Sequence, residues 1–147
     1  MSSIYSHILL ATDLLDEADK VADKAKRLAG LEQAKLSAIH VVENLPLYFG
    51  DELVLPDTEA IERQLVERSE IRMAELCKRL GIPSEQGYVQ LGVTKQEIIG
   101  FAEESGVDLI VLGSHSRHGL EHLLGSTARA VVNSARCDVL AVRVGKD

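Results

Sequence analysis

The stretch Asp108-Leu-Ile-Val-Leu-Gly113 is the most apolar short run of this sequence and indicates the class of fold. The run is too short for a helix, and its uninterrupted apolar residues are typical of a strand that is buried on both faces. Strands of that kind belong to parallel sheets that carry helices on both sides. We therefore expect residues 108–113 to be a buried strand of such a sheet.

Helical patterns stand on both sides of this strand. Upstream, Thr94-Lys-Gln-Glu97 has the form of a capping box, and it predicts a helix that ends at Ser105-Gly106. Downstream, a connection rich in Gly, Ser and His leads to a second helix at 126–136 and then to an apolar strand at 138–144. The C-terminal half therefore alternates between strand and helix.

The N-terminal half alternates in the same way. It contains strands at 8–12, 36–42 and 87–91, a helix from Ala18 that Gly30 is expected to end, and a long helix at 61–80. On the long helix one face is expected to point inward, and its residues are Ile61, Leu65, Met73, Leu76 and Leu80. The alternation predicts an α/β fold with a five-stranded parallel, doubly wound sheet, covered by helices on both faces.

Composition and charge limit the functions that are open to this chain. Of its 147 residues 46% are apolar and 27% charged, and no linker or repeat divides them, so residues 1–147 are expected to form one domain. A net charge of −7 disfavours binding to nucleic acid. The sequence carries neither a signal peptide nor an apolar run long enough for a membrane span, which predicts a cytoplasmic protein that binds no membrane.

The expected strand order, 3-2-1-4-5, predicts where a ligand would bind. This order makes neighbours of the first and fourth strands at a topological switch point, and open α/β sheets bind ligands beyond the strand ends there. Ala11-Thr12-Asp13 follows the first strand, 113–127 follows the fourth, and Val41 lies at the end of the second. These segments are therefore expected to border one crevice.

Residue types in the crevice suit a phosphate and a ribose. Gly125-Ser126-Thr127 opens a helix, whose free N–H groups and positive dipole end favour an oxyanion. The carboxylate of Asp13 could accept hydrogen bonds from ribose hydroxyls. From residue types alone a plainer interpretation stays open, in which Ser126 or Thr127 caps the helix and the glycines only form turns.

The histidines and serines of this connection suggest neither a metal centre nor an enzyme. His118 and His122 are spaced as metal ligands on a helix, but no cysteine lies nearby, and loop histidines are usually exposed, so no dedicated metal site is expected. No G-x-S-x-G nucleophile elbow occurs, and no second catalytic residue accompanies Asp13, so no catalytic residue is assigned. A receiver-type signalling domain is disfavoured because Leu14-Leu15, rather than an acidic cluster, follows Asp13.

Five motifs in the right order resemble the universal stress protein family across residues 4–144. They are His7-Ile-Leu-Leu-Ala-Thr-Asp13, Ile39-His40-Val41, Asp108-Leu-Ile-Val-Leu-Gly-Ser-His115, Leu124-Gly-Ser-Thr-Ala128 and Cys137-Asp-Val-Leu-Ala-Val142. The resemblance implies a Rossmann-like fold of the adenine nucleotide alpha hydrolase type and a regulatory role in stress responses rather than enzymatic catalysis. Weak ATP hydrolysis stays open under this resemblance.

One branch of that family binds ATP through the motif G-x2-G-x9-G-[ST], which this chain matches in part. Gly113, Gly125 and Ser126 fit the motif, whereas Ser116 replaces its second glycine and only eight residues separate Ser116 from Gly125. The resemblance implies ATP or AMP, with Mg²⁺, as a possible ligand. The residues expected to contact it are Ala11, Thr12, Asp13, Val41, Leu112, Gly113, His115, Ser116, Gly125, Ser126 and Thr127.

The resemblance also implies a homodimer in which the last strand pairs with its twin. Self-pairing would cover an exposed sheet edge by a symmetric contact. The alternative is a protein of the UspA type that binds no nucleotide and recruits an unknown protein partner. In that case the partner would bind the dimer surface or segment 43–58, whose role the sequence does not reveal.

Overall fold

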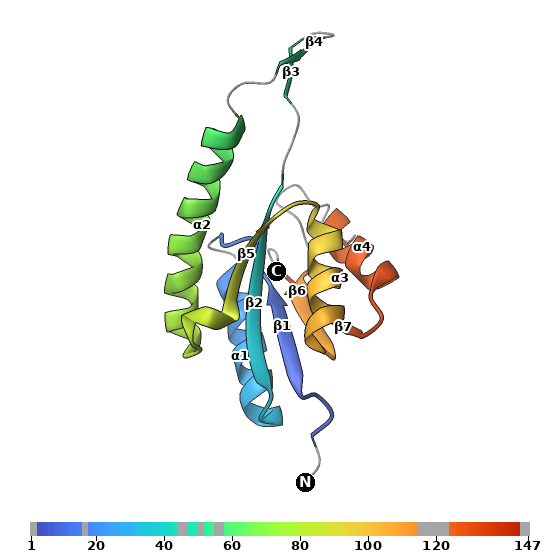
Figure 1. The fold of residues 1–147 in the computed structure, drawn as a ribbon. Helices are drawn as coiled ribbons and strands as arrows, with labels where there is room; N and C mark the ends of the chain where they lie inside the picture. Colours follow the sequence, from blue (N-terminus) through green and yellow to red (C-terminus); the bar gives the residue numbers. More distant parts are fainter. Residues whose placement is uncertain are drawn as a thin grey trace.

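Five parallel strands form one sheet in the computed structural model of this chain, which describes residues 3–15, 18–43, 47–49, 52–54, 58–114 and 124–144 (Figure 1). The strand order is β5-β2-β1-β6-β7, which confirms the predicted order 3-2-1-4-5. The strands are β1 (His7–Ala11), β2 (Lys35–Val42), β5 (Gly87–Leu91), β6 (Leu109–Gly113) and β7 (Asp138–Val142).

Two helices cover each face of the sheet. Helices α1 (Ala18–Glu32) and α2 (Thr58–Leu80) pack on one face, and α3 (Thr94–Ser105) and α4 (Ser126–Ser134) pack on the other (Figure 1). A short 3₁₀ helix, η1 (Ser84–Gln86), leads from α2 into β5. No helix in the described part of the chain combines the length and apolarity needed to cross a membrane.

The core consists of two apolar clusters, one on each face of the sheet. Successive side chains of a strand point to opposite faces, so Ile8 and Leu10 of β1 join the cluster under α1 and α2, whereas Leu9 joins the one under α3 and α4. All three side chains are fully buried. Burial on both faces explains why the central strands are continuous apolar runs in the sequence.

Helix α1 ends later than the sequence predicts. Gly30 was expected to end it, but the helix continues to Glu32, and Gln33 takes the left-handed conformation that follows a helix end (φ 53°). The N–H of Ala34 then donates to the carbonyl of Ala29 at 2.9 Å. Gln33 therefore takes the conformation that was assigned to a glycine, while Gly30 lies inside the helix.

Only the second half of α2 packs on the sheet. Met73, Leu76 and Leu80 are buried as predicted, but Ile61 and Leu65 are 46% and 42% exposed, which corrects the expectation that they point inward. The 23 residues of α2 span about 35 Å, whereas the eight residues of β2 span about 26 Å. The first turns of α2 therefore extend past the end of the sheet (Figure 1).

Segment 43–58, for which no regular structure was predicted, contains a small antiparallel hairpin. Its strands are β3 (Leu47–Phe49) and β4 (Glu52–Val54). The hairpin lies beyond the carboxyl end of the sheet, on the side toward which the first turns of α2 project (Figure 1). Strands of this length are too short to produce a recognisable alternation in the sequence.

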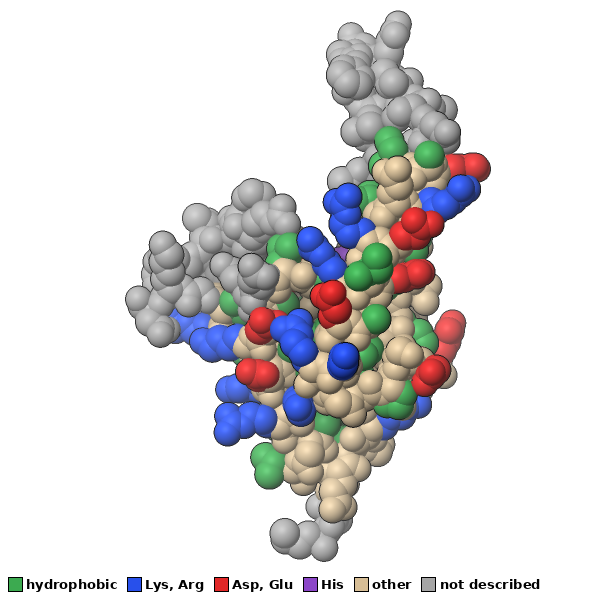
Figure 2. Space-filling model, turned by 90° about the vertical axis from the view of Figure 1, so that its left-hand side faces the viewer, with side chains coloured by type: hydrophobic (Ala, Val, Ile, Leu, Met, Phe, Trp, Pro, Cys, Tyr) green, Lys and Arg blue, Asp and Glu red, His purple; other side chains and the backbone are tan. Residues whose placement is uncertain are grey.

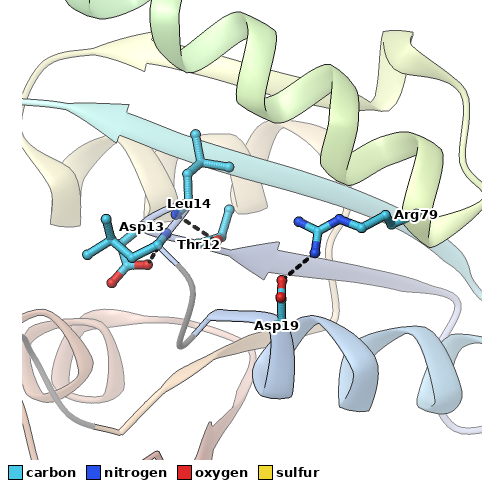
Figure 3. Close-up of polar contacts among 6 residues, drawn as sticks. Thr12, Asp13, Leu14, Asp19 and Arg79 are labelled. Carbon is cyan, nitrogen blue, oxygen red and sulfur yellow. Dashed lines mark hydrogen bonds and ion pairs between the residues drawn. The ribbon is translucent and has the colours of Figure 1, made fainter.

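A polar contact joins the two helices on the α1 face. The guanidinium of Arg79 donates to the carboxylate of Asp19 at 2.6 Å (Figure 3). The ammonium of Lys26 donates to the carbonyl of Arg79 at 3.2 Å. Both side chains of the ion pair are more than half exposed, at 59% and 55%. The pair therefore orients α2 against α1 and adds at most about 1 kcal/mol of stability.

The amino ends of the strands are held by a network around His7 and Asp108. The carboxylate of Asp108 accepts hydrogen bonds from the N–H groups of Ser6 and His7 and from the Ser6 hydroxyl, at 2.9–3.0 Å. Burial raises the pKa of Asp108, but these hydrogen bonds together outweigh it and hold the pKa below its ordinary value. The network thus ties the start of β1 to the start of β6.

His7 is a buried histidine in its neutral form. Its Nδ1 lies 3.1 Å from the carbonyl of Ser105, which can only accept, so Nδ1 carries the proton. Its Nε2 lies 2.8 Å from the hydroxyl of Ser37 and accepts from it. Burial lowers the pKa of His7 below that of a free histidine, because the charged form is costly to desolvate.

Acid is expected to destabilise the protein through His7. A lowered pKa means that the unfolded chain binds a proton more readily than the folded one, so stability is complete above the unfolded pKa of about 6.5 and declines as the pH falls below it. Urea denaturation should therefore give a lower free energy of unfolding at pH 5.5 than at pH 7.5. His7→Gln should reduce this difference, and an unchanged difference would contradict the assignment.

Candidate functional site

A cavity of about 310 Å³ opens at the carboxyl end of the sheet, where β1 and β6 lie side by side. This is the switch point of the strand order, since the chain leaves β1 toward β2 on one side and leaves β6 toward β7 on the other. The residues that line the cavity are Ala11, Thr12, Asp13, Leu15, Ala18, Val21, Ile39, His40, Val41, Thr94, Ile98, Leu112, Gly113, Gly125, Thr127, Ala128 and Val144.

The turn between β1 and α1 forms one wall of the cavity, and its own side chains hold it. The N–H of Leu14 donates to the hydroxyl of Thr12 at 3.0 Å, and the N–H of Leu15 donates to Oδ1 of Asp13 at 2.9 Å (Figure 3). Leu14 has a φ of 62°, a left-handed conformation that a leucine rarely adopts. The two side-chain hydrogen bonds offset this strain and keep Thr12 and Asp13 at the cavity.

His40 connects the same turn to β2. Its Nδ1 lies 2.8 Å from the carbonyl of Thr12 and must donate to it, and the N–H of Thr12 donates to the carbonyl of Ile39 at 2.9 Å. The side chain of His40 is half-buried and lines the cavity. The end of β2 thus fixes the backbone of the turn by two hydrogen bonds, one to the carbonyl and one from the N–H of Thr12.

The opposite wall is the end of β6 and the start of α4. Gly113 lies so close to Val144 and Val21 that an added Cβ would be 3.2 Å from a methyl group of Val144. Gly125 is the N-cap of α4, its N–H donates to the carbonyl of Ser114 at 2.7 Å, and as a glycine it provides no side-chain cap. The first N–H groups of α4 therefore have no acceptor within the helix, as is usual at a helix start.

Helix α3 contributes Thr94, which the sequence assigned to a different role. The capping box predicted at Thr94–Glu97 is wrong: Val93 is the N-cap, and it makes no side-chain cap. The hydroxyl of Thr94 instead donates to the carboxylate of Glu43, at the end of β2, over 2.6 Å. This contact joins the start of α3 to β2 at the rim of the cavity.

The structure brings most of the expected ligand-contacting residues together. Eight of them line the cavity: Ala11, Thr12, Asp13, Val41, Leu112, Gly113, Gly125 and Thr127. Ser126 is exposed at the start of α4 and is not among the lining residues, so its expected contact with the ligand stays a prediction. His115 and Ser116 lie outside the described residues.

Sequence reasoning missed several lining residues. His40 could have been found, because it stands beside Val41 at the carboxyl end of a predicted strand. Ile98 and Ala128 were not assigned to the site, and Thr94 was assigned only a role as a cap. Thr94, Ile98 and Ala128 share one signal in the sequence. Each lies near the start of a helix that begins at the ligand-binding edge of the sheet.

Metal binding and thiol chemistry find little support in the described residues. Among them no group of three or more His, Cys, Asp or Glu side chains could hold a metal ion. Cys77 is buried and Cys137 half-buried, and burial is the largest cause that raises the pKa of both thiols. A raised pKa disfavours the reactive thiolate.

Comparisons with known proteins agree with this geometry. Universal stress protein A homolog 1 of Coxiella burnetii is 40% identical over 94% of this chain and 96% of its own length. UspA of Lactobacillus plantarum superposes with a TM-score of 0.76 at 25% identity, covering 95% of this chain and 98% of its own. A universal stress protein solved in complex with cAMP shares the fold at 24% identity, with a TM-score of 0.62 and 95% and 98% coverage. The model of the universal stress protein family matches residues 4–143, and this chain belongs to that family.

Proposed function

We propose that this protein is a regulatory module of a cytoplasmic stress response and that it binds an adenine nucleotide, ATP or AMP, in the switch-point cavity. The observation that carries the proposal is the cavity itself, which combines an apolar wall, a positioned carboxylate at Asp13 and the open start of α4. Its volume of about 310 Å³ lies at the lower end of the range for small-molecule sites.

The walls of the cavity suit the base, the ribose and the phosphate of a nucleotide. Ile39, Val41 and Ile98 give one side an apolar surface on which a purine ring can lie. Asp13 uses one carboxylate oxygen in the turn and keeps the other for a ribose hydroxyl. The N–H groups and positive dipole end of α4 favour a phosphate near Gly125 and Thr127.

The charge of the cavity favours a nucleotide that arrives with Mg²⁺. Among the described lining residues there is no lysine or arginine, and Asp13 is the one carboxylate. A triphosphate would therefore keep a cation of its own, bound by phosphate oxygens rather than by a dedicated cluster of protein ligands. The cAMP bound to the relative of similar fold is also an adenine nucleotide, which supports the choice of base.

We also propose that the protein acts by binding rather than by catalysis and that it works as a homodimer through β7. Among the residues that the structure describes, β7 is an edge strand that pairs with β6, and an open edge favours pairing with a second copy. Light scattering at micromolar concentration is expected to give twice the chain mass, and a monomer would exclude this dimer.

A second candidate function is a protein-interaction module that needs no nucleotide. The first turns of α2 favour it, because they expose Ile61 and Leu65 beyond the sheet. Figure 2 views the molecule from the left of Figure 1 and shows hydrophobic side chains among basic and acidic ones. If this protein binds no nucleotide, the exposed first turns of α2 are the first place to search for a partner.

Calorimetric titration of nucleotide-free protein with Mg-ATP and with AMP tests the primary proposal. We expect binding in the micromolar range, and we expect Asp13→Ala and Gly125→Ala to weaken it by about tenfold or more, because each alters one wall of the cavity. Asp19→Ala is the matched control, since Asp19 is exposed on α1 and does not line the cavity. Absence of binding at millimolar nucleotide would refute the proposal and favour the interaction module.

A further inference from the structure

We infer that Thr94, held by Glu43, selects a purine that carries an amino group at position 6 and discriminates against a purine that carries an oxygen there. This inference rests on the proposed nucleotide site and adds to it a residue that determines base specificity. It starts from the 2.6 Å hydrogen bond between the Thr94 hydroxyl and the Glu43 carboxylate.

The apolar part of the cavity defines where a base would lie. Ile39, Val41, Ile98, Leu112 and Ala128 line the cavity and belong to the core cluster under α3 and α4. An aromatic base gains most by covering this surface, whereas the ribose and phosphates suit the polar turn and the start of α4. Helix α3 contributes Ile98 and Thr94 to the lining, so Thr94 is its polar group beside the base.

The direction of the Thr94 hydrogen bond decides what Thr94 can offer to a ligand. A carboxylate can only accept, so the single hydroxyl proton of Thr94 points to Glu43. Toward the cavity Thr94 Oγ1 then presents lone pairs, which accept a hydrogen bond but cannot give one. An amino group at the edge of the base satisfies this oxygen, whereas a carbonyl oxygen at the same place is repelled by it.

Two other polar side chains of the cavity are each engaged by the turn between β1 and α1. The hydroxyl of Thr12 accepts from the N–H of Leu14, and Nδ1 of His40 donates to the carbonyl of Thr12. Both side chains come from the ends of β1 and β2 and serve the turn, whereas Thr94 lies on the helix that covers the apolar wall. Glu43 itself is exposed and does not line the cavity.

Three triphosphates that have the same ribose and phosphates but different bases isolate the contribution of the base to the affinity. Nucleotide-free protein is titrated with Mg-ATP, with purine riboside triphosphate, which lacks the substituent at position 6, and with inosine triphosphate, which has an oxygen there. Wild-type protein is expected to bind them in this order, with about a tenfold difference between the first and the last, the size of one unmet hydrogen bond in a partly exposed site.

Two substitutions, Glu43→Gln and Thr94→Val, test whether the difference in affinity comes from the contact between Thr94 and Glu43. In Glu43→Gln the amide can donate to Thr94 Oγ1, which frees the hydroxyl proton for the cavity, so inosine triphosphate should gain affinity and the difference should fall to about threefold or less. Thr94→Val should weaken ATP and remove the preference, whereas Thr94→Ser keeps the hydroxyl and should retain it. Glu97→Gln changes a neighbouring carboxylate of α3 that does not line the cavity and should leave the order unchanged.

The outcomes separate this inference from the function on which it rests. Equal affinity of the wild type for the three nucleotides, or a preference that persists in both Glu43→Gln and Thr94→Val, would overturn the inference and leave nucleotide binding intact. Absence of binding for all three would overturn the proposed function and the inference with it. Thermal melting of each variant confirms that a lost preference does not come from unfolding.

Discussion

Replacement of Gly87 by alanine is expected to lower the free energy of unfolding by about 1–3 kcal/mol, because a Cβ at this position has no room. Gly87 begins β5 where α2 packs on the sheet, and an added Cβ would lie 2.5 Å from Sγ of Cys77 and 2.7 Å from Cγ of Met73. Both neighbours are buried, so they can move only by disturbing the core. Urea denaturation of the purified variant measures the loss.

A double-mutant cycle tests the cause of that loss. In a Cys77→Ala background the closest clashing atom is absent, so Gly87→Ala should cost less there than in the wild type. Gly30→Ala is the matched control, because Gly30 lies inside α1 with nothing within 4 Å of an added Cβ. It is expected to stabilise the protein by about 0.5–1 kcal/mol. Equal costs of Gly87→Ala in both backgrounds would exclude the clash as the cause.

Filling the cavity from the end of β1 is expected to abolish nucleotide binding without unfolding the protein. Ala11 is half-buried, lines the cavity and packs against the cluster under α3 and α4. A leucine side chain at this position would occupy the space assigned to the base, so Ala11→Leu should weaken Mg-ATP binding by about 100-fold or more.

Stability and a surface control distinguish blocked binding from misfolding. The added methyl groups enter existing space, so the free energy of unfolding should change by less than about 1 kcal/mol. Ala74→Leu makes the same chemical change on the exposed face of α2 and should alter neither affinity nor stability. Unchanged ATP affinity in Ala11→Leu would mean that the nucleotide binds elsewhere.

The sheet was predictable because burial leaves a strong pattern in the sequence. The strands around Leu9 and Ile110 are covered on both faces, so they read as apolar runs that no surface helix or loop imitates. Alternation with helices then restricted the topology to few orders, and the order placed Thr12, Asp13 and Gly113 at one crevice. The location of the cavity therefore followed from topology.

The failures of sequence reasoning share a cause, which is that the deciding contact or length is not local. Thr94 and Glu97 fit a capping box, but the partner of Thr94 is Glu43, which is 51 positions away in the chain. Ile61 fits the inward face of α2, yet the helix is longer than the strands it covers. Gly30 has the preferred residue type for a helix end, but Gln33 takes that conformation.

Chemical-shift mapping with AMP tests the central claim most directly, because it reports both binding and its place. Nucleotide-free, ¹⁵N-labelled protein is titrated with AMP while the backbone amide signals are followed. We expect the largest changes at Thr12, Asp13, Gly113 and Thr127, which line the cavity near the ends of β1 and β6 and the start of α4. No change at millimolar AMP, or changes confined to the hairpin of β3 and β4 or to β7, would contradict it.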